Sequence, residues 1–213
     1  MTTVLILYAS SLGNTKRMAD AIAEGAGDVE QVTVRMQTID ETSIDDIWAC
    51  DALVLGSPVR QGSADLRVRS FLENDCERLM LSGRLATKVG AVFTVGATPH
   101  GRHGDGAEIA QLAMLRSLAA GGMTIVSGPC EWRSATLRGP FWGPHARLCI
   151  QEDGREVLQD GSVEAGQLHG YRVAQATQSF KHRPSMLPRR MAGGWPRMAD
   201  IFSGVRAHLR SVR

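Results

Sequence analysis

The sequence has little that would anchor the chain in a membrane or cross-link it. No apolar run reaches the roughly 20 residues that a transmembrane helix needs. The N-terminal stretch has no basic segment before its apolar residues, so we expect no secretory signal and a cytoplasmic protein. The cysteines are widely spaced and form no CxxC pair, which predicts reduced thiols and no cysteine metal site: Cys50, Cys76, Cys130 and Cys149.

Two familiar nucleotide-binding signatures are also missing. The sequence contains no GxxxxGK[ST], which marks the phosphate loop of many nucleoside triphosphatases. It also contains no GxGxxG, which marks the dinucleotide-binding βαβ unit. Nucleoside triphosphates and the usual dinucleotide fold are therefore not favoured.

Acidic residues are scarce only at the C-terminal end. Residues 181–213 contain eight Lys or Arg and one acid, Asp200, for a net charge of +7. Residues 1–180 contain 16 Lys or Arg and 21 Asp or Glu, for a net charge of −5. An argument for nucleic-acid binding could therefore rest on the tail alone, and we expect no nucleic-acid partner.

Apolar runs alternate with helical patterns along the chain. Continuous apolar runs indicate buried strands, and the period of two in residues 31–37 indicates a strand nearer a sheet edge. The expected strands are 3–9, 31–37, 52–58, 88–96 and 123–128, and 147–158 is a candidate continuation of the sheet. The expected helices are 14–26, 65–79, 106–122 and 162–180. This alternation predicts one α/β domain over 1–180 with a five-stranded parallel sheet, followed by a basic extension over 181–213.

Three polar loops directly follow expected strands: 9–15, 57–64 and 96–106. Ligands of such sheets bind outside the carboxyl ends of the strands, so these loops are the candidate binding site. The first loop reads ASSLGNT and enters a helix, where free backbone N–H groups and the helix dipole favour a phosphate. Gly13 would allow a positive φ. The alternative is a helix capped by Ser or Asn with no ligand.

Three stretches resemble a known family. YASSLGNTKRMADAIAEGA resembles the phosphate loop of flavodoxin-like proteins, and DALVLGSPVRQGSADLRVRSFLE resembles the WrbA-type NAD(P)H:quinone oxidoreductases. SGRLATKVGAVFTVG and GPFWGPHA continue the resemblance, which covers about residues 3–175. The resemblance implies a flavodoxin-like, doubly wound sheet of order 2-1-3-4-5 that holds FMN between three loops.

The resemblance also implies which residues hold FMN. The phosphate would be bound by Ser10, Ser11, Leu12, Gly13, Asn14 and Thr15. The isoalloxazine would lie along Ser57, Pro58, Val59, Arg60, Gln61 and Gly62. The other side would be closed by Val95, Gly96, Ala97, Thr98, Pro99 and His100. Arg60 could stabilise the anionic reduced flavin; the alternative is a surface salt bridge.

The chain departs from the family at three positions. It has Leu12, Met80 and Gly121 where the family often has an aromatic residue, a Trp and a His that help to form the nicotinamide and quinone pocket. FMN binding survives these changes more easily than a particular substrate does. Met80, Trp142 and His145 are the candidate substrate-pocket residues, although Trp142 could equally pack in the core.

The stretch HGRHGDG holds the candidate proton donors, His100 and His103. With Asp105 they could be read as a metal site, but HxxH on a glycine loop lacks a clear further ligand, so we expect no metal. A solvated loop is the third reading.

The tail carries an apolar helical stripe after Pro196: Met198, Ile201, Phe202, Val205 and Leu209. We expect this helix to pack on the body or on a sister subunit of a homo-oligomer, a dimer or tetramer. Binding of the tail to an anionic membrane surface, an acidic protein or a nucleic acid is the less favoured reading.

The resulting functional expectation is an FMN-dependent oxidoreductase that passes reducing equivalents from NAD(P)H to a quinone or similar acceptor. Two alternatives stay open. One is a flavodoxin-type electron carrier without a small-molecule substrate, and the other is a flavin-binding protein whose tail recruits a partner.

Overall fold

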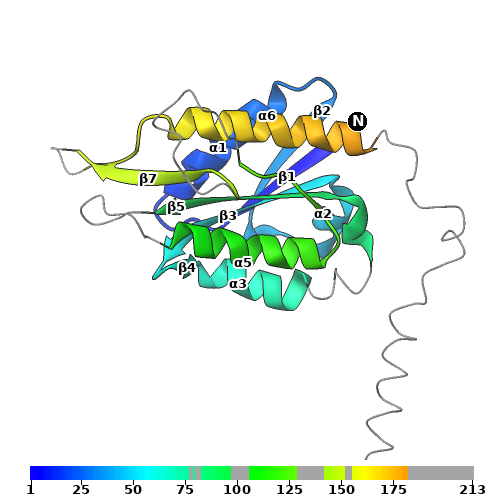
Figure 1. The fold of residues 1–213 in the computed structure, drawn as a ribbon, viewed down its shortest axis with the longest axis horizontal. Helices are drawn as coiled ribbons and strands as arrows, with labels where there is room; N and C mark the ends of the chain where they lie inside the picture. The colour runs from blue at the N-terminus through cyan, green and yellow to red at the C-terminus, as the bar shows by residue number, and fades with distance from the viewer. Residues whose placement is uncertain (77–78, 80–82, 97–105, 129–141, 152–154, 182–213) are drawn as a thin grey trace, which may run out of the picture. The chain divides into compact units, whose positions relative to one another are not determined.

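A predominantly parallel sheet forms the centre of the protein (Figure 1). The computed structural model describes residues 1–76, 79, 83–96, 106–128, 142–151 and 155–181. The strands follow the order β2-β1-β3-β5-β7-β8, with β4 beside β3 and β6 beside β5. Their bounds are β1 Thr2–Tyr8, β2 Val32–Thr38, β3 Ala52–Arg60, β4 Ser63–Ala64, β5 Val89–Gly96, β6 Thr124–Ile125, β7 His145–Ile150 and β8 Glu156–Leu158.

The pairing confirms the expected topology. β1 is parallel to both β2 and β3, and β5 is parallel to β3 and β7. With β5 as the fourth strand of the parallel series, this is the predicted order 2-1-3-4-5. β2 ends the path, as its alternating sequence predicts, and it is half-buried along its whole length without alternation between buried and exposed residues.

The fifth position of the sheet is shared by two short segments. The expected strand at 123–128 is reduced to β6, which pairs with Val89 and Gly90 at the start of β5. β7 pairs with the other end of β5, from Thr94 to Gly96. β8 then pairs antiparallel with β7, so the candidate continuation of the sheet is a hairpin.

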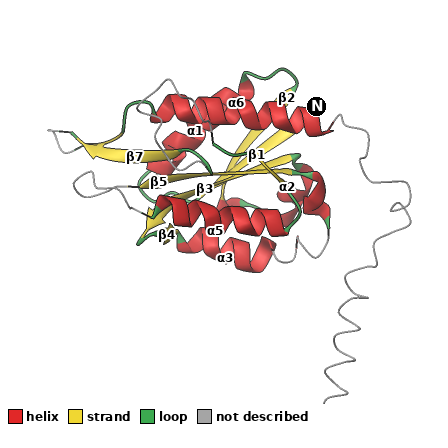
Figure 2. Cartoon of the chain, viewed as in Figure 1, coloured by secondary structure: helices red, strands yellow, loops and turns green. Residues whose placement is uncertain are grey.

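Helices cover both faces of the sheet (Figure 2). α1 and α6 lie on one face, and α3 and α5 lie on the other (Figure 1). Their bounds are α1 Asn14–Gly27, α2 Ile44–Ala49, α3 Leu66–Phe71, α5 Ala107–Ala120 and α6 Ser162–Lys181. Three expected helices are thereby confirmed. None of the helices in the described part of the chain is both long and apolar enough to cross a membrane.

Two helical segments differ from the expectation. The helix expected over 65–79 ends as α3 at Phe71 and continues as a π-helical turn, Leu72–Cys76. Apolar spacing cannot reveal this change because it does not report the backbone hydrogen-bond pattern. α2 was not expected, since six residues are too few to show a period. Its sequence signal is the capping box of Ser43 and Asp46, in which each side chain accepts the other residue's backbone N–H.

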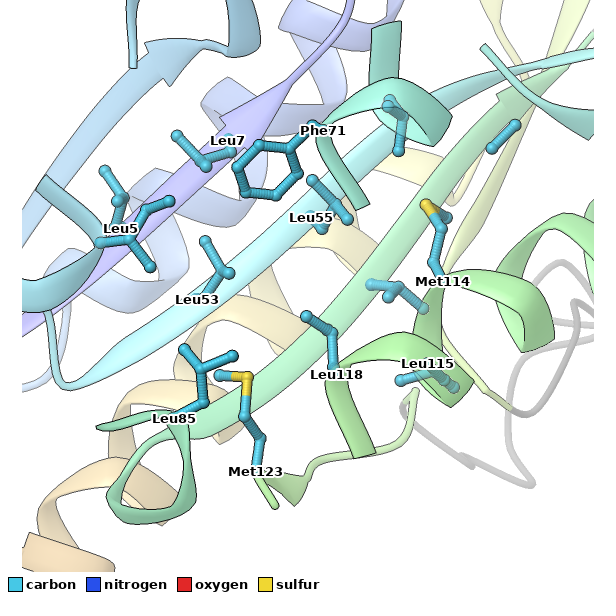
Figure 3. Packing of buried hydrophobic residues seen from close by; sticks show 14 of the residues in the cluster. Leu5, Leu7, Leu53, Leu55, Phe71, Leu85, Met114, Leu115, Leu118 and Met123 are labelled. Carbon is cyan, nitrogen blue, oxygen red and sulfur yellow. The ribbon is translucent and has the colours of Figure 1, made fainter. Parts of the chain in front are cut away.

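The core forms two layers, one on each side of the sheet. Leu5, Leu7, Leu53 and Leu55 point towards a layer that includes Phe71, Leu85, Met114, Leu115, Leu118 and Met123 (Figure 3). The alternate residues Val4, Ile6 and Val54 point to the other layer, with Met18, Ile22 and Val173. Because both faces are covered, these strands read as continuous apolar runs.

Residues Met1–Lys181 form one compact unit. At its edge, Lys181 Nζ lies 2.8 Å from Asp51 Oδ2 and donates to the Met1 carbonyl. The end of α6 is therefore tied to the first strand. The predicted boundary at residue 180 stays a prediction, and the expected tail helix lies outside the described residues.

Candidate functional site

Three segments meet at the carboxyl edge of the sheet, where β1, β3 and β5 end. β1 and β5 both pair in parallel with β3, so their ends lie side by side. The first segment follows Tyr8, the second includes the end of β3 at Arg60, and the third begins at Val95. The described residues of the three predicted loops thus lie at one edge of the sheet.

The first segment enters α1 through Gly13. Gly13 is the N-cap, with a left-handed φ of 83°, and no side chain among the described residues caps the helix. Ser10 Oγ accepts the Gly13 N–H at 3.1 Å. The alternative of a Ser or Asn cap is therefore wrong, and the first-turn N–H groups face outwards from an acid-free turn.

The space beyond Gly13 is open. A Cβ placed there would meet no heavy atom of the described residues within 4 Å, apart from those of its chain neighbours. Thr15 and Asn14 are buried behind the loop, whereas Leu12 is 74% exposed. Asn14 Nδ2 donates to Glu156 Oε2 at 2.7 Å, and Arg17 donates to the Glu156 carbonyl at 3.3 Å. The β7–β8 hairpin thus supports the start of α1.

The second segment is a tight hairpin. Val59 pairs with Ala64 and Arg60 with Ser63, so that Gln61 and Gly62 form a two-residue turn. Both turn residues have a positive φ, 50° and 74°, as a turn matched to the twist of the strands requires. The backbone of this predicted ring-binding segment is consequently fixed by its own hydrogen bonds.

Ser57 and Asp65 lock the base of this hairpin. Ser57 Oγ accepts the Asp65 N–H at 2.8 Å and donates to the Pro58 carbonyl at 2.9 Å. Asp65 caps α3 by accepting the Arg67 N–H at 3.0 Å. The Arg67 side-chain hydrogen bond is the largest cause that lowers the pKa of Asp65, and burial opposes it. The carboxylate is therefore ionised at neutral pH.

Two arginines share the Asp65 carboxylate. Arg67 Nε lies 2.9 Å from Oδ1, and Arg60 Nε lies 3.9 Å from Oδ2. Arg67 also donates to Ser11 Oγ at 3.0 Å. Sequence reasoning missed Arg67, because nothing in the spacing of residues 11 and 67 marks them as neighbours. The salt-bridge alternative for Arg60 has a partner here, although the contact is long and Arg60 is half-exposed.

The third segment closes against the second. Val95 and Gly96 end β5, and Gly106, the N-cap of α5, has a φ of 80° and makes no side-chain cap hydrogen bond. A Cβ on Gly106 would lie 2.2 Å from the Gly62 Cα, so the two backbones touch and Gly106 has no room for a side chain. The other predicted residues of this segment lie outside the described residues: Ala97, Thr98, Pro99, His100 and His103.

A buried polar cluster lies under α5 beside the end of β5. Gln111 Nε2 donates to Thr94 Oγ1 at 2.9 Å and to the Gly143 carbonyl at 3.0 Å. Thr94 Oγ1 lies 2.9 Å from His145 Nδ1. Sequence reasoning named His145 but missed Thr94 and Gln111. Trp142, three residues before His145, is 40% exposed, so core packing does not account for it.

The remaining predicted residues are not brought together by the described structure. Met80 lies outside the described residues. Among those that are described, no group of three or more His, Cys, Asp or Glu side chains is placed to hold a metal ion. Cys50 and Cys149 are free thiols.

The geometry at the start of α1 suits a ligand with an anionic end. The uncapped start of α1, with Ser and Thr hydroxyls and an open space, has the donors that a phosphate needs. The hairpin at 59–64 has a backbone fixed by its own pairing and carries the half-exposed Arg60.

Known proteins resemble this chain in sequence and in fold. A family model described as a flavodoxin domain matches residues 5–128. The chain belongs to the flavodoxin family. A protein of Gluconacetobacter diazotrophicus named NAD(P)H dehydrogenase (quinone) is 30% identical over 82% of this chain and 96% of its own length. A protein of the same name from Syntrophobacter fumaroxidans is 28% identical over 83% of this chain and 98% of its own.

A solved structure is also similar to this chain in its fold. The flavodoxin, WrbA-like protein from Agrobacterium tumefaciens covers 84% of this chain and 99% of its own, with a TM-score of 0.63 and 24% identity. The comparison shows a shared fold. The resemblance read from the sequence is confirmed, and this member of the flavodoxin family is an oxidoreductase whose flavin is FMN.

Proposed function

We propose that this flavodoxin-family protein passes reducing equivalents from NAD(P)H to a quinone or a similar acceptor. The observation that carries the proposal is the uncapped, acid-free start of α1 beside the rigid hairpin at 59–64. The relatives named NAD(P)H dehydrogenase (quinone), which the chain matches over nearly their whole length, supply the donor and the acceptor class.

The phosphate of FMN would be held by the first segment. Its ligands would be the first-turn N–H groups of α1 and the hydroxyls of Ser10, Ser11 and Thr15, with Leu12 and Asn14 completing the loop. The fit is supported by the open space at Gly13 and by the absence of acidic residues from the first turn. A phosphate there gains from both the hydrogen bonds and the helix dipole.

The ring would lie against the second segment and be covered by the third. Backbone N–H groups of Val59 to Gln61 would face its polar edge, and Arg60 would offset negative charge there. When bound, the flavin supplies the redox chemistry by taking up and passing on a hydride equivalent, whereas the chain supplies binding, orientation and charge.

Protons would be supplied by imidazoles around the ring. The proposed proton donors are His100 and His103. The proposed residues of the substrate pocket are Trp142, His145 and Met80. The described cluster supports a role for His145: Thr94 Oγ1 accepts from Gln111, so its own hydrogen can go to His145 Nδ1. That arrangement keeps the other ring nitrogen, Nε2, as the protonated one.

Assembly into a homo-oligomer through the tail stays part of the proposal. Its motivation is the apolar stripe after Pro196 in the sequence. A molar mass from light scattering above that of one 23.0 kDa chain would support it.

A spectrum and a steady-state assay test the proposal. Purified protein should carry FMN and not FAD, and should oxidise NAD(P)H much faster when a quinone is present. Bound FMN with no acceptor-dependent NAD(P)H oxidation would instead favour an electron carrier. A colourless protein that binds no added flavin would contradict the proposal.

A further inference from the structure

Arg67 contacts three segments that are far apart in the sequence. It lies at the start of α3 and reaches Asp65 on its own element, Ser11 in the first loop, and Asp40 after β2 at 3.7 Å. Its side chain is only 32% exposed despite its charge. Contacts with three segments restrict the Arg67 side chain to one position beside the first loop.

The Asp65 carboxylate fixes the direction of the guanidinium. Arg67 donates from Nε to Oδ1 at 2.9 Å and from Nη2 to Oδ2 at 3.2 Å. This two-point contact matches the planar fork of an arginine to the plane of a carboxylate. Asp65 is in turn held by Ser57 at the base of the hairpin. The second segment thus anchors Arg67, and Arg67 reaches across to the first.

The contact with Ser11 determines what that serine can offer. Arg67 Nη2 donates to Ser11 Oγ, so one lone pair of the hydroxyl is taken and its hydrogen remains available to another acceptor. A cation on the oxygen also polarises the O–H bond and makes it a better donor. Ser11 is exposed in the loop that enters α1, so that donor is accessible to a ligand.

We propose that Arg67 is a positioning residue of the phosphate site, acting through Ser11. It holds the first loop against the hairpin and leaves the Ser11 hydroxyl as a donor for the phosphate of FMN. The inference rests on the proposed function, because it assigns Arg67 to the FMN site of that function. Its effect is specific to the phosphate, since Ser11 belongs to the loop and not to the ring-binding hairpin.

Flavin titrations of the full-length protein stripped of flavin test the inference. Arg67→Ala should weaken FMN binding about tenfold or more and change riboflavin binding less than about twofold, because riboflavin lacks the phosphate. Arg69→Ala is the matched control, since it removes an exposed cation two residues further along the same helix. Its FMN affinity should stay near that of the unaltered protein.

Three more variants show whether the effect passes through Ser11. Ser11→Ala should weaken FMN binding in the same direction, and Ser11→Ala with Arg67→Ala should be no weaker than the worse single variant. Arg67→Lys keeps the charge but cannot span Asp65 and Ser11 with a planar fork, so it should lose part of the affinity. This last variant decides the question if Arg67→Ala does not fold.

The outcomes separate this inference from the function on which it rests. Three results would overturn the role of Arg67 without touching the proposed function. They are equal losses of affinity for FMN and riboflavin, equal losses of FMN affinity in the Arg67 and Arg69 variants, and additive losses of FMN affinity for Ser11→Ala and Arg67→Ala. Unaltered protein that binds neither flavin would overturn the proposed function as well.

Discussion

On one face of the sheet α1 and α6 meet through glycines, whereas on the other α3 and α5 pack through leucine, methionine and phenylalanine side chains (Figure 3). A Cβ on Gly170 would lie 1.9 Å from the Ile22 carbonyl oxygen, and one on Gly25 would lie 1.8 Å from that of Gln167. The helices α1 and α6 are therefore packed backbone to backbone.

This difference in packing determines how each face can accommodate a substitution. Side chains can shift among rotamers when a neighbour changes, but two touching helix backbones can only move apart. Two of the three site segments lead into the side-chain face: Asp65 and Arg67 belong to α3 and its cap, and the third segment leads into α5. The glycine face holds the start of α1 in place for the phosphate loop.

The largest effect should come from breaking the glycine face. Gly170→Val should cost about 4 kcal/mol or more of unfolding free energy, because its Cβ collides with the α1 backbone. Urea denaturation followed by circular dichroism measures this. Gly27→Ala is the control: its Cβ would meet nothing within 4 Å, so stability should hold or rise by up to about 1 kcal/mol. Similar losses in the two variants would refute tight packing.

A smaller effect should follow from a cavity in the side-chain face. Met114 is fully buried on α5, and Met114→Ala should cost about 3 kcal/mol. Leu112 is 50% exposed on the same helix, so Leu112→Ala should stay within about 0.5 kcal/mol. The same denaturation experiment gives both values, and a Met114 variant as stable as the Leu112 variant would show that this layer is not close-packed.

The regular part of the fold could be predicted because its signals are periodic. Buried strands on a covered sheet are continuous apolar runs, and α1, α5 and α6 are long enough to show their apolar spacing. α2 and the hairpin of β3 and β4 were missed as elements because they are short. The division of the fifth position between β6 and β7 depends on which half of β5 each pairs with, and this is a tertiary choice.

The site could be predicted as loops but not as contacts. Gly13 was singled out because glycine allows a positive φ, and it has one. The contact between Gly62 and Gly106 and that between Ser11 and Arg67 join residues more than 40 positions apart. No local pattern encodes such pairs, since they arise only when the strand ends are brought to one edge.

The smallest expected effect concerns the pH dependence of stability, and it follows from a comparison of two buried basic side chains, Lys88 and His169. Lys88 donates to the carbonyls of Trp48 and Cys50 at the end of α2, so its charge is satisfied. His169 on α6 is fully buried, and neither ring nitrogen has a hydrogen bond of normal geometry within the described residues. Burial, with a smaller contribution from Arg172, lowers the pKa of His169 from 6.5 to about 3, while the nearby Val92 carbonyl opposes the shift.

The unfolded chain therefore binds a proton at His169 below pH 6.5, whereas the folded chain does so only near pH 3. Protons favour the unfolded state in this window, so stability falls as the pH falls. From pH 7 to pH 5 the loss due to His169 should be about 2 kcal/mol. His169→Leu should remove that part of the pH dependence and leave the contributions of the other titratable groups. Urea titrations of both proteins at pH 5 and pH 7 measure the difference, and identical pH dependence would mean that His169 finds a proton-accepting partner or water in the folded state.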